Sequence, residues 1–199
     1  MEAGRVCTGF SKPYVAKLTE TKMGNTWMVG YKDARMLARG VSVSIEPENS
    51  DDNEFFADNG TGESGMVRFT RGDLTLTVDG LNHETEQFLM GTTSDGSWIT
   101  YGDSQQAPIV GVGFIARYQS GGTTVYVPMI IRKCQFNQIS TNAETQEEQI
   151  NWQTQELSAK ILKTNDIGQW KWIGIDYDSE LKAENAIRRR FNLTQIEEA

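Results

Sequence analysis

Alternating apolar and polar positions recur along this chain and predict β-strands. Every second side chain is apolar in one run, as in a strand with one buried face: Val41, Val43 and Ile45 alternate with Ser42, Ser44 and Glu46. In the run 67–79, Val67 and Phe69 set one apolar face. After Gly72 the apolar positions are Leu74, Leu76 and Val78, opposed by the polar positions Asp73, Thr75, Thr77 and Asp79.

The longest β-rich stretch, residues 109–136, predicts an antiparallel hairpin. Its two halves are joined by the turn sequence Gln119-Ser120-Gly121-Gly122. With about ten residues each, the two strands would reach about 34 Å. Pro128 cannot donate a ladder hydrogen bond, so we expect the second strand to lie at a sheet edge or to be bulged there.

Residues 136–163 allow two interpretations. An apolar alternation at 150–152 resumes in the opposite phase at 157–161, as a strand with a bulge near Gln155 would do. A helix is the alternative. A last strand is expected over residues 170–177.

Two helices are predicted. Asn82 can cap the start of a short helix and Gly91 can end it. Residues 178–199 predict a C-terminal helix and tail, in which Glu184 can form an ion pair with Arg188. The apolar stripe of that helix would be Ala183, Ala186, Ile187 and Phe191.

Composition favours a mainly β protein of one domain. The chain has 199 residues, with 19 glycines and only four prolines, and a chain of this length can bury about 70% of its unfolded surface in one core. No internal repeat or linker divides it. We therefore expect one domain over residues 1–199, with residues 1–12 as an N-terminal arm.

Negative charge is concentrated in one segment. It contains no Lys or Arg and supplies nearly the whole net charge of -8, through Glu46, Glu48, Asp51, Asp52, Glu54, Asp58 and Glu63. We expect residues 46–65 to form a projecting acidic loop. An acidic balance argues against tight nucleic-acid binding, because phosphates are bound by clusters of Lys and Arg. The basic run 188–190 would fan over about 200° of a helix, which favours solvated charge over a phosphate clamp.

Cysteine usage and hydropathy favour a protein made in a cytoplasm. Cys7 and Cys134 belong to no CxxC pair, which predicts reduced thiols. No run has the length of a signal-peptide core or of a membrane span of roughly 20 residues. We expect no membrane association.

Motifs of catalysis lack their structural context. Gly60 to Gly65 matches GxGxxG, but β-patterned sequence follows it where a dinucleotide site needs a helix. Gly102-Asp103-Ser104 resembles the start of an esterase nucleophile block, yet the only histidine, His83, lies upstream and no third triad member is evident.

Candidate metal ligands lack the usual spacing, and candidate sugar-binding aromatic residues have a commoner role. One histidine and two separated cysteines make no zinc constellation. Oxygen donors of the acidic segment lack the spacing of a calcium loop: Asp51, Asp52, Asn53 and Glu54, or Asp58, Asn59 and Glu63. Several aromatic residues could stack on sugars, although core or interface positions are commoner for them in a β-rich domain: Trp98, Tyr101, Trp152, Trp170 and Trp172.

Four blocks follow one another in the chain: LTLTVDGLNHETEQFLMG, VGVGFIARYQSGGTTVYVPMIIRKCQFN, ETQEEQINWQTQELSAKIL and WKWIGIDYDSELKAENAI. Together they resemble the major tail tube proteins of long, flexible, non-contractile-tailed (siphovirus-type) bacteriophages, particularly those of Gram-positive bacteria. The similarity extends from about Gly9 to Phe191.

This resemblance implies a tail-tube-type β-sandwich or barrel of antiparallel sheets with a flanking helix. It implies hexameric rings stacked into a hollow tube, the virion tail tube, through which double-stranded DNA passes without specific binding. It further implies a structural protein with no catalytic residues and no cofactor. The expected partners are copies of the chain itself and the tape-measure, tail terminator and distal tail proteins.

Two hypotheses about surfaces follow. The acidic segment would contact an adjacent subunit or ring, and the interface residues would be Phe55, Phe56, Glu48, Asp51, Asp52 and Pro128. The lumen would be lined by a polar wall that lets the densely charged duplex slide, formed by Asp73, Thr75, Thr77 and Asp79. Alternatives are a carbohydrate-binding module of a phage baseplate, a tail terminator ring, and a hydrolase that uses carboxylates or Ser104.

Overall fold

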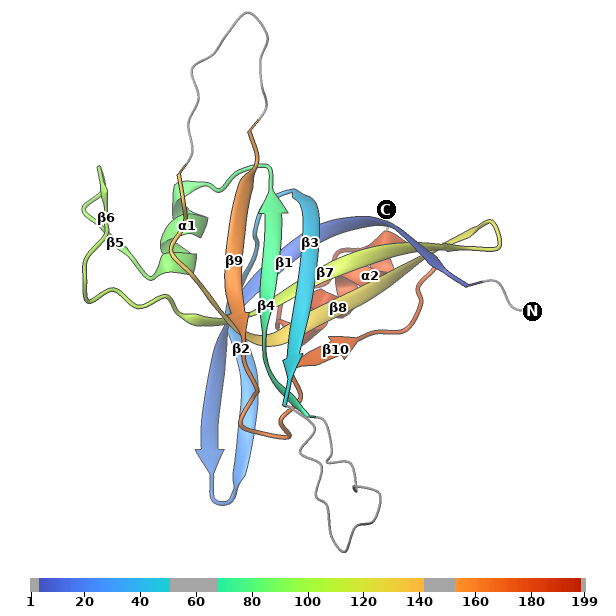
Figure 1. Ribbon diagram of the computed structural model, residues 1–199, viewed down its shortest axis with the longest axis horizontal. Helices are drawn as coiled ribbons and strands as arrows, with labels where there is room; N and C mark the ends of the chain where they lie inside the picture. The colour runs from blue at the N-terminus through green and yellow to red at the C-terminus, as the bar shows by residue number, and fades with distance from the viewer. Residues whose placement is uncertain (1–3, 51–67, 142–152, 198–199) are drawn as a thin grey trace, which may run out of the picture.

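The computed structural model describes residues 4–50, 68–141 and 153–197 and is mainly β, as the sequence predicts. Eight antiparallel strands form one sheet in the order β2-β1-β7-β8-β9-β4-β3, and β10 also pairs with β8. This sheet folds over on itself: Figure 1 shows β9, β4 and β3 crossing β1, β7 and β8 at a steep angle. The result is a sandwich of two layers.

The elements are distributed over the two layers as follows. The first layer holds β1 (Val6–Met23), β2 (Thr26–Met36), β7 (Ile109–Ser120), β8 (Thr123–Phe136) and β10 (Lys171–Ile173). The second layer holds β3 (Gly40–Asn49), β4 (Phe69–Val78) and β9 (Gln155–Ile161). The remaining described elements are the helices α1 (His83–Met90) and α2 (Glu180–Arg190) and the small hairpin of β5 (Thr93–Ser94) and β6 (Ile99–Thr100).

A β-bulge in β8 allows this strand to belong to both layers. Arg132 and Lys133 together lie opposite the single residue Gly111 of β7, because the register of the two strands shifts by one residue there. A bulge bends its strand and increases its twist. Before the bulge β8 pairs with β10, and after it β8 pairs with β9, so the corner of the sandwich lies at these two basic residues.

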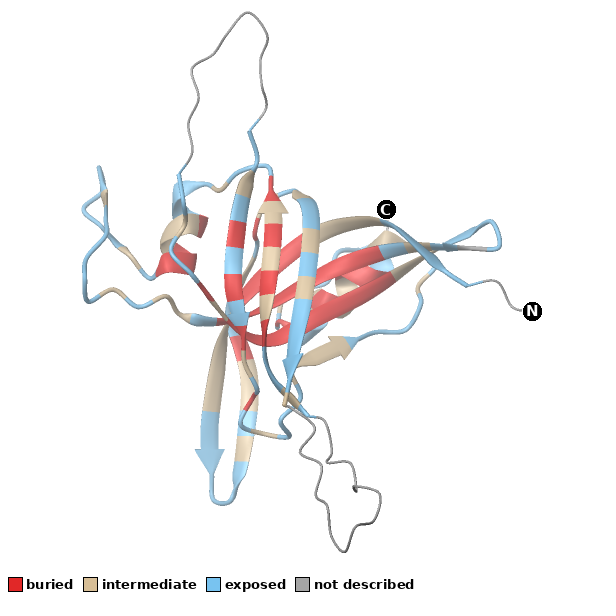
Figure 2. Cartoon of the chain, in the orientation of Figure 1, coloured by how far each residue is buried: buried red, intermediate tan, exposed pale blue. Residues whose placement is uncertain are grey.

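The apolar faces predicted by sequence alternation form the core between the layers. Buried and more exposed positions alternate along β4 and β9, as Figure 2 shows. The inward side chains of the second layer are Leu74, Leu76, Val78, Leu157, Ala159 and Ile161. They pack with residues of the first layer, including Val112, Phe114, Met129 and Ile131.

The strand interpretation of residues 155–161 is therefore confirmed, and the helix alternative is wrong for them. Their register with β4 is unbroken from Gln155 onward, so the described strand contains no bulge. Residues 150 and 152, on which the expected phase change rested, lie outside the described residues.

Helix α1 forms with the predicted caps. The Asn82 side chain accepts a hydrogen bond of 2.8 Å from the Thr85 backbone N–H. Gly91 ends the helix in the left-handed region, with φ 65°, and its N–H bonds to the Gln87 carbonyl. Phe88 then packs into the core between the layers, so α1 closes one end of the sandwich.

Helix α2 covers the face of the first layer that points away from the second layer. Its buried residues Ala183 and Ile187, followed by Phe191, pack on Tyr14, Ala16, Ile115 and Ile130. Gly113 permits this approach, since a Cβ atom there would lie 2.7 Å from Ile187 Cγ2. Ala186 of the predicted stripe is only partly buried.

The predicted ion pair between Glu184 and Arg188 is wrong. Glu184 instead lies 3.5 Å from the Lys12 Nζ and accepts a 2.5 Å hydrogen bond from the Tyr14 hydroxyl. Arg188 donates to the same hydroxyl at 2.9 Å. The two helix residues meet through a strand residue because the side chain of Tyr14 lies between them.

The N-terminal arm expected over residues 1–12 is also wrong from Val6 onward. Strand β1 begins there and pairs with β7 as far as Lys17, while its second half pairs with β2 in a hairpin. The turn of this hairpin is Gly24-Asn25, and Gly24 has φ 60°. Neither strand was predicted from the sequence, although a Gly-Asn pair between two alternating runs is a hairpin signal.

The long hairpin of β7 and β8 is confirmed, with a tighter turn than expected: the strands are joined by Gly121 and Gly122 alone, both with positive φ. Pro128 lies inside the sheet, paired with Ile115 on one side. On the other side of Pro128, the segment that follows β10 contains one more residue than β8 does between the pairs Met129–Ile173 and Tyr126–Tyr177. The prediction for β8 itself is therefore wrong, because β8 is neither an edge nor bulged at Pro128, and the extra residue lies in the neighbouring segment.

Candidate assembly surfaces

The acidic segment begins inside a strand. Glu46 and Glu48 belong to β3, so the loop expected from residue 46 starts later. Glu48 is exposed and forms an ion pair of 2.5 Å with Arg71 across the β3-β4 ladder. The other proposed interface residues of this segment, Asp51, Asp52, Phe55 and Phe56, lie outside the described residues.

Pro128, the remaining proposed interface residue, is buried within the chain. A Cβ atom on Gly174 would lie 2.6 Å from the Pro128 ring, which shows how closely the two backbones approach. The side chain of Pro128 is therefore packed inside the subunit, and a contact of this residue with another copy stays a prediction.

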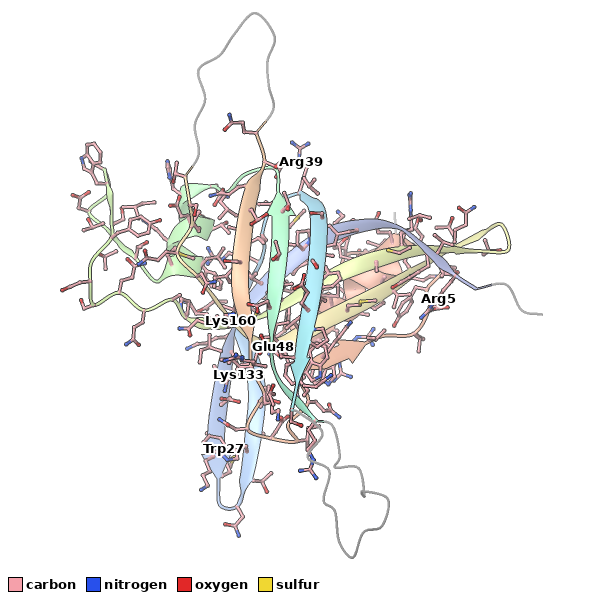
Figure 3. All side chains as sticks on the ribbon, in the orientation of Figure 1. Arg5, Trp27, Arg39, Glu48, Lys133 and Lys160 are labelled. Atoms are coloured by element: carbon pink, nitrogen blue, oxygen red, sulfur yellow. The ribbon has the colours of Figure 1, made fainter. Side chains whose placement is uncertain are left out.

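The four residues predicted to line a lumen lie on or next to β4, within a polar outer face of the second layer. The alternate positions of β4, β3 and β9 that point away from the core carry hydroxyl or charged side chains: Ser42, Ser44, Glu46, Asp73, Thr75, Thr77, Glu156, Ser158 and Lys160. Figure 3 marks Arg39, Glu48 and Lys160 on this part of the molecule.

Most charges of this face are paired with a neighbour. Asp73 lies 2.5 Å from Lys160 on β9. Asp79, just beyond β4, forms a 2.5 Å ion pair with Arg39. The hydrogen bonds that the side chain and backbone of Arg39 donate to Asp79 lower the pKa of Asp79. Thr77 accepts a 3.0 Å hydrogen bond from Ser42. Thr75 lies between Ser44 and Ser158, in the middle of the face. The face is therefore polar, and its cations Lys160 and Arg39 are paired, whereas Glu46 and Glu156 have no ion pair among the described residues.

Two strands end the first layer on opposite sides, and both carry exposed apolar side chains. Among the described residues, strand β2 pairs only with β1, and its Met28 and Met36 are 57% and 41% exposed. Strand β10 likewise pairs only with β8 in the described part of the chain, and next to its other edge Ile173 and Ile175 are 56% and 71% exposed. Unpaired edges of this kind can add another strand.

A buried polar network holds β10 in place. Arg132 is 2% exposed, and its guanidinium binds Asp166 at 2.5 and 3.1 Å and the Thr164 hydroxyl at 3.0 Å. Burial alone would raise the pKa of Asp166, but the bonds from Arg132 and Thr164 lower it to about 2. The Arg132 side chain also lies 4.2 Å from the centre of the Trp172 ring.

Lys133, the second residue of the bulge, connects the segment that contains Thr164 and Asp166 to the β1-β2 hairpin. Lys133 forms a 2.7 Å ion pair with Glu20, and both side chains are nearly buried. Glu20 also accepts two 2.9 Å hydrogen bonds from Asn165. These residues were not predicted from the sequence, where their signal is a pair of basic residues in the middle of an otherwise apolar strand.

The residues of the weighed catalytic and metal motifs do not converge. Ser104 and His83 are exposed, and no hydrogen bond joins them in the part of the chain that the structure describes. The glycine motif at 60–65 and the proposed calcium ligands lie outside that part. Within it, no three His, Cys, Asp or Glu side chains are grouped as metal ligands, and neither helix is long and apolar enough to cross a membrane. Cys7 and Cys134 are both free thiols.

The aromatic candidates divide into partly buried and exposed ones. Trp170 stacks on Phe69, with 4.4 Å between ring centroids, and Trp172 lies between two arginines. In contrast, Trp98 is 75% exposed and Tyr101 is 47% exposed. Trp152 lies outside the described residues.

Comparison with known proteins adds no assignment, since neither a family model nor a curated protein matches the chain.

Proposed function

We propose that this protein is the subunit of a bacteriophage tail tube, in which hexameric rings stack around a conduit for the genome. The observation that carries this proposal is the pair of free edges on the first layer, β2 and β10, each with exposed apolar side chains. The resemblance in sequence supports the same function. The protein would then act in the virion after synthesis in the bacterial cytoplasm.

Edges on opposite sides of one layer favour a heterologous contact, in which different surfaces of two copies meet. Such contacts generate a ring when the rotation between copies closes. Strand pairing would satisfy the unpaired backbone groups of β2 and β10, and burial of Met28 and Ile175 would contribute about 25 cal/mol per Å² of apolar surface.

The polar face of β3, β4 and β9 suits the wall of a DNA conduit. Duplex DNA carries a charge about every 1.7 Å, so a wall of free lysines would bind it tightly. Here Lys160 is already paired with Asp73, and Arg39 with Asp79. The hydroxyl groups between these pairs offer no net charge. A wall of this composition permits sliding. Tape-measure, tail terminator and distal tail proteins would contact other parts of the tube.

Electron microscopy of concentrated purified protein tests the proposal. Wild-type protein should form tubes or stacked rings, whereas Met28→Lys and Ile175→Lys should each prevent lateral assembly by placing a charge at one edge. Ile167→Lys is the matched control, because Ile167 is equally exposed, at 67%, but lies outside both edges. A wild-type protein that stays monomeric under all conditions would contradict the proposal.

A carbohydrate-binding module is the second candidate, favoured by the exposed aromatic side chains of Trp98 and Tyr101. Exposed aromatic rings are able to stack on sugar faces. Quenching of tryptophan fluorescence by cell-wall glycans, lost in Trp98→Phe combined with Tyr101→Ser, would support this alternative in a protein that remains monomeric.

A further inference from the structure

An exposed tryptophan lies at the tip of a well-fixed arm. We define the β5-β6 arm as residues 92–107, which leave the body of the protein after α1 and return at β7. Trp98 follows the turn of its hairpin and is the most exposed large apolar side chain of the described residues, at 75%. Full burial of a tryptophan removes about 150–250 Å² of surface from water, so a partner that covers Trp98 would gain binding energy from it.

Hydrogen bonds hold the backbone that carries this side chain. The Asp95 carboxylate accepts bonds of 2.9 and 2.8 Å from the backbone N–H groups of Ser97 and Trp98, which lower its pKa. At the base of the arm the Tyr101 hydroxyl donates to Glu86 of α1, and Gln105 donates to the Met90 carbonyl at 2.9 Å. The arm therefore presents Trp98 in a defined place.

A groove suited to such a side chain lies between β10 and α2. It has a volume of about 710 Å³, within the usual range of about 300–1,000 Å³ for ligand sites. Its walls include the apolar side chains Pro128, Ile130, Trp172, Ile173, Ala186 and Ile187. We name it the β10-α2 groove.

The charges of arm and groove are complementary. Of the described residues that line the groove, the charged ones are basic: Lys171, Arg189 and Arg190. The only charged residues of the arm are acidic, Asp95 and Asp103. Arg190 lies 4.8 Å from the centre of the Trp172 ring, so a cation is held at the rim of the groove beside an aromatic wall.

Arm and groove lie at opposite ends of the molecule. Figure 1 shows the arm at one end of the long axis and β10 and α2 toward the other. The arm is attached to α1, which lies beside β2, since Arg35 of β2 is 4.3 Å from the Phe88 ring centre. Each end therefore combines one free sheet edge with one of these two surfaces: β2 with the arm, and β10 with the groove.

We propose that Trp98 of one copy inserts into the β10-α2 groove of the next copy. This inference rests on the proposed self-assembly and assigns its lateral contact to named residues. Trp98 is the knob of this contact. Because the knob and the β10-α2 groove lie at different ends of the molecule, the contact is heterologous and can repeat around a ring. Trp98 would be the central anchor of the interface, surrounded by the contacts between acidic arm and basic rim.

Complementary single-surface variants test this contact. Trp98→Ala lacks the knob but keeps the groove, and Ala186→Trp fills the groove but keeps the knob. Each variant alone should associate at least about 30-fold more weakly than wild type in sedimentation velocity, the effect of losing an interface anchor. An equimolar mixture should form heterodimers that grow no further. Ile167→Ala, which removes another exposed apolar side chain, should associate like wild type.

A charge exchange provides a second measurement in case Ala186→Trp fails to fold. Arg190→Glu and Asp103→Arg should each weaken association, and their mixture should restore it in part. Trp98→Ala that associates as strongly as wild type would overturn the inference and leave the tube proposal standing. If the mixture forms heterodimers but the wild-type protein forms no tubes, the inference is supported and the tube proposal is contradicted. A mixture and a wild type that both remain monomeric would overturn both.

Discussion

The hydroxyl of Tyr31 donates a 2.9 Å hydrogen bond to the backbone carbonyl of Arg132, at the bulge where β8 passes from one layer to the other. Burial raises the pKa of Tyr31 to about 12, so the hydroxyl remains a donor at physiological pH. The Tyr31 ring covers Gly111, the single residue opposite the bulge, and a Cβ atom there would lie 2.5 Å from it. Strand β2 thus fixes the corner of the sandwich.

Gly111→Ala should destabilise the protein by about 1–3 kcal/mol, because the added methyl group overpacks against Tyr31. Urea unfolding monitored by circular dichroism measures this loss. Gly102→Ala is the matched control, since a Cβ atom there meets no neighbour, and it should be nearly neutral. Equal stabilities of the two variants would show that the corner tolerates side chains.

Tyr31→Phe tests the hydrogen bond without changing the packing of the ring. Loss of the bond to the Arg132 carbonyl should cost about 1 kcal/mol. Chemical denaturation at neutral pH measures the change. A variant as stable as wild type would mean that the carbonyl finds another donor in the folded protein.

Asp166 should make the stability of the folded protein depend on pH in the acid range. Its pKa of about 2 in the folded protein lies below the ordinary value near 3.9, so its contribution is present above about pH 4 and is lost as the pH falls through 2. This shift corresponds to about 2 kcal/mol. Asp166→Asn should lower stability at pH 7 and flatten the acid limb of an unfolding titration; an unchanged limb would exclude Asp166 as its source.

Tyr14→Phe should loosen the attachment of α2. Glu184 is 4% exposed and would lose its 2.5 Å hydrogen bond, at a cost of about 1.5–3 kcal/mol for a bond to a charged group. Hydrogen exchange of the α2 amides should then accelerate. Lys182→Ala, which removes the exposed ion pair with Asp178, should leave exchange in the centre of the helix almost unchanged.

Thr75→Lys tests the proposed lumen without breaking an ion pair. Thr75 has the uncharged neighbours Ser44 and Ser158, whereas a lysine at Asp73 would face Lys160. If this face lines the tube, a ring of lysines should slow genome delivery while tubes still assemble, and Thr75→Gln should behave like wild type. DNA release from purified phage gives the rate. Failed assembly would place Thr75 at an interface.

Local patterns in the sequence determined much of the secondary structure. The alternation around Leu74, Leu76 and Val78 predicted β4 and its buried face, and Asn82 and Gly91 predicted the ends of α1. These predictions succeeded because side-chain period and helix capping depend on residues a few positions apart. The free cysteines were also anticipated from their spacing.

Tertiary structure alone decided where distant residues meet. Glu184 and Arg188 have ideal spacing for an ion pair, yet Tyr14, some 170 positions away in the chain, separates them. The basic pair Arg132 and Lys133 interrupts an apolar strand, and only the folded chain reveals it as a bulge that turns β8 from one layer into the other. The placement of the β5-β6 arm and the β10-α2 groove at opposite ends likewise depends on the path of the whole sheet, which no local pattern encodes.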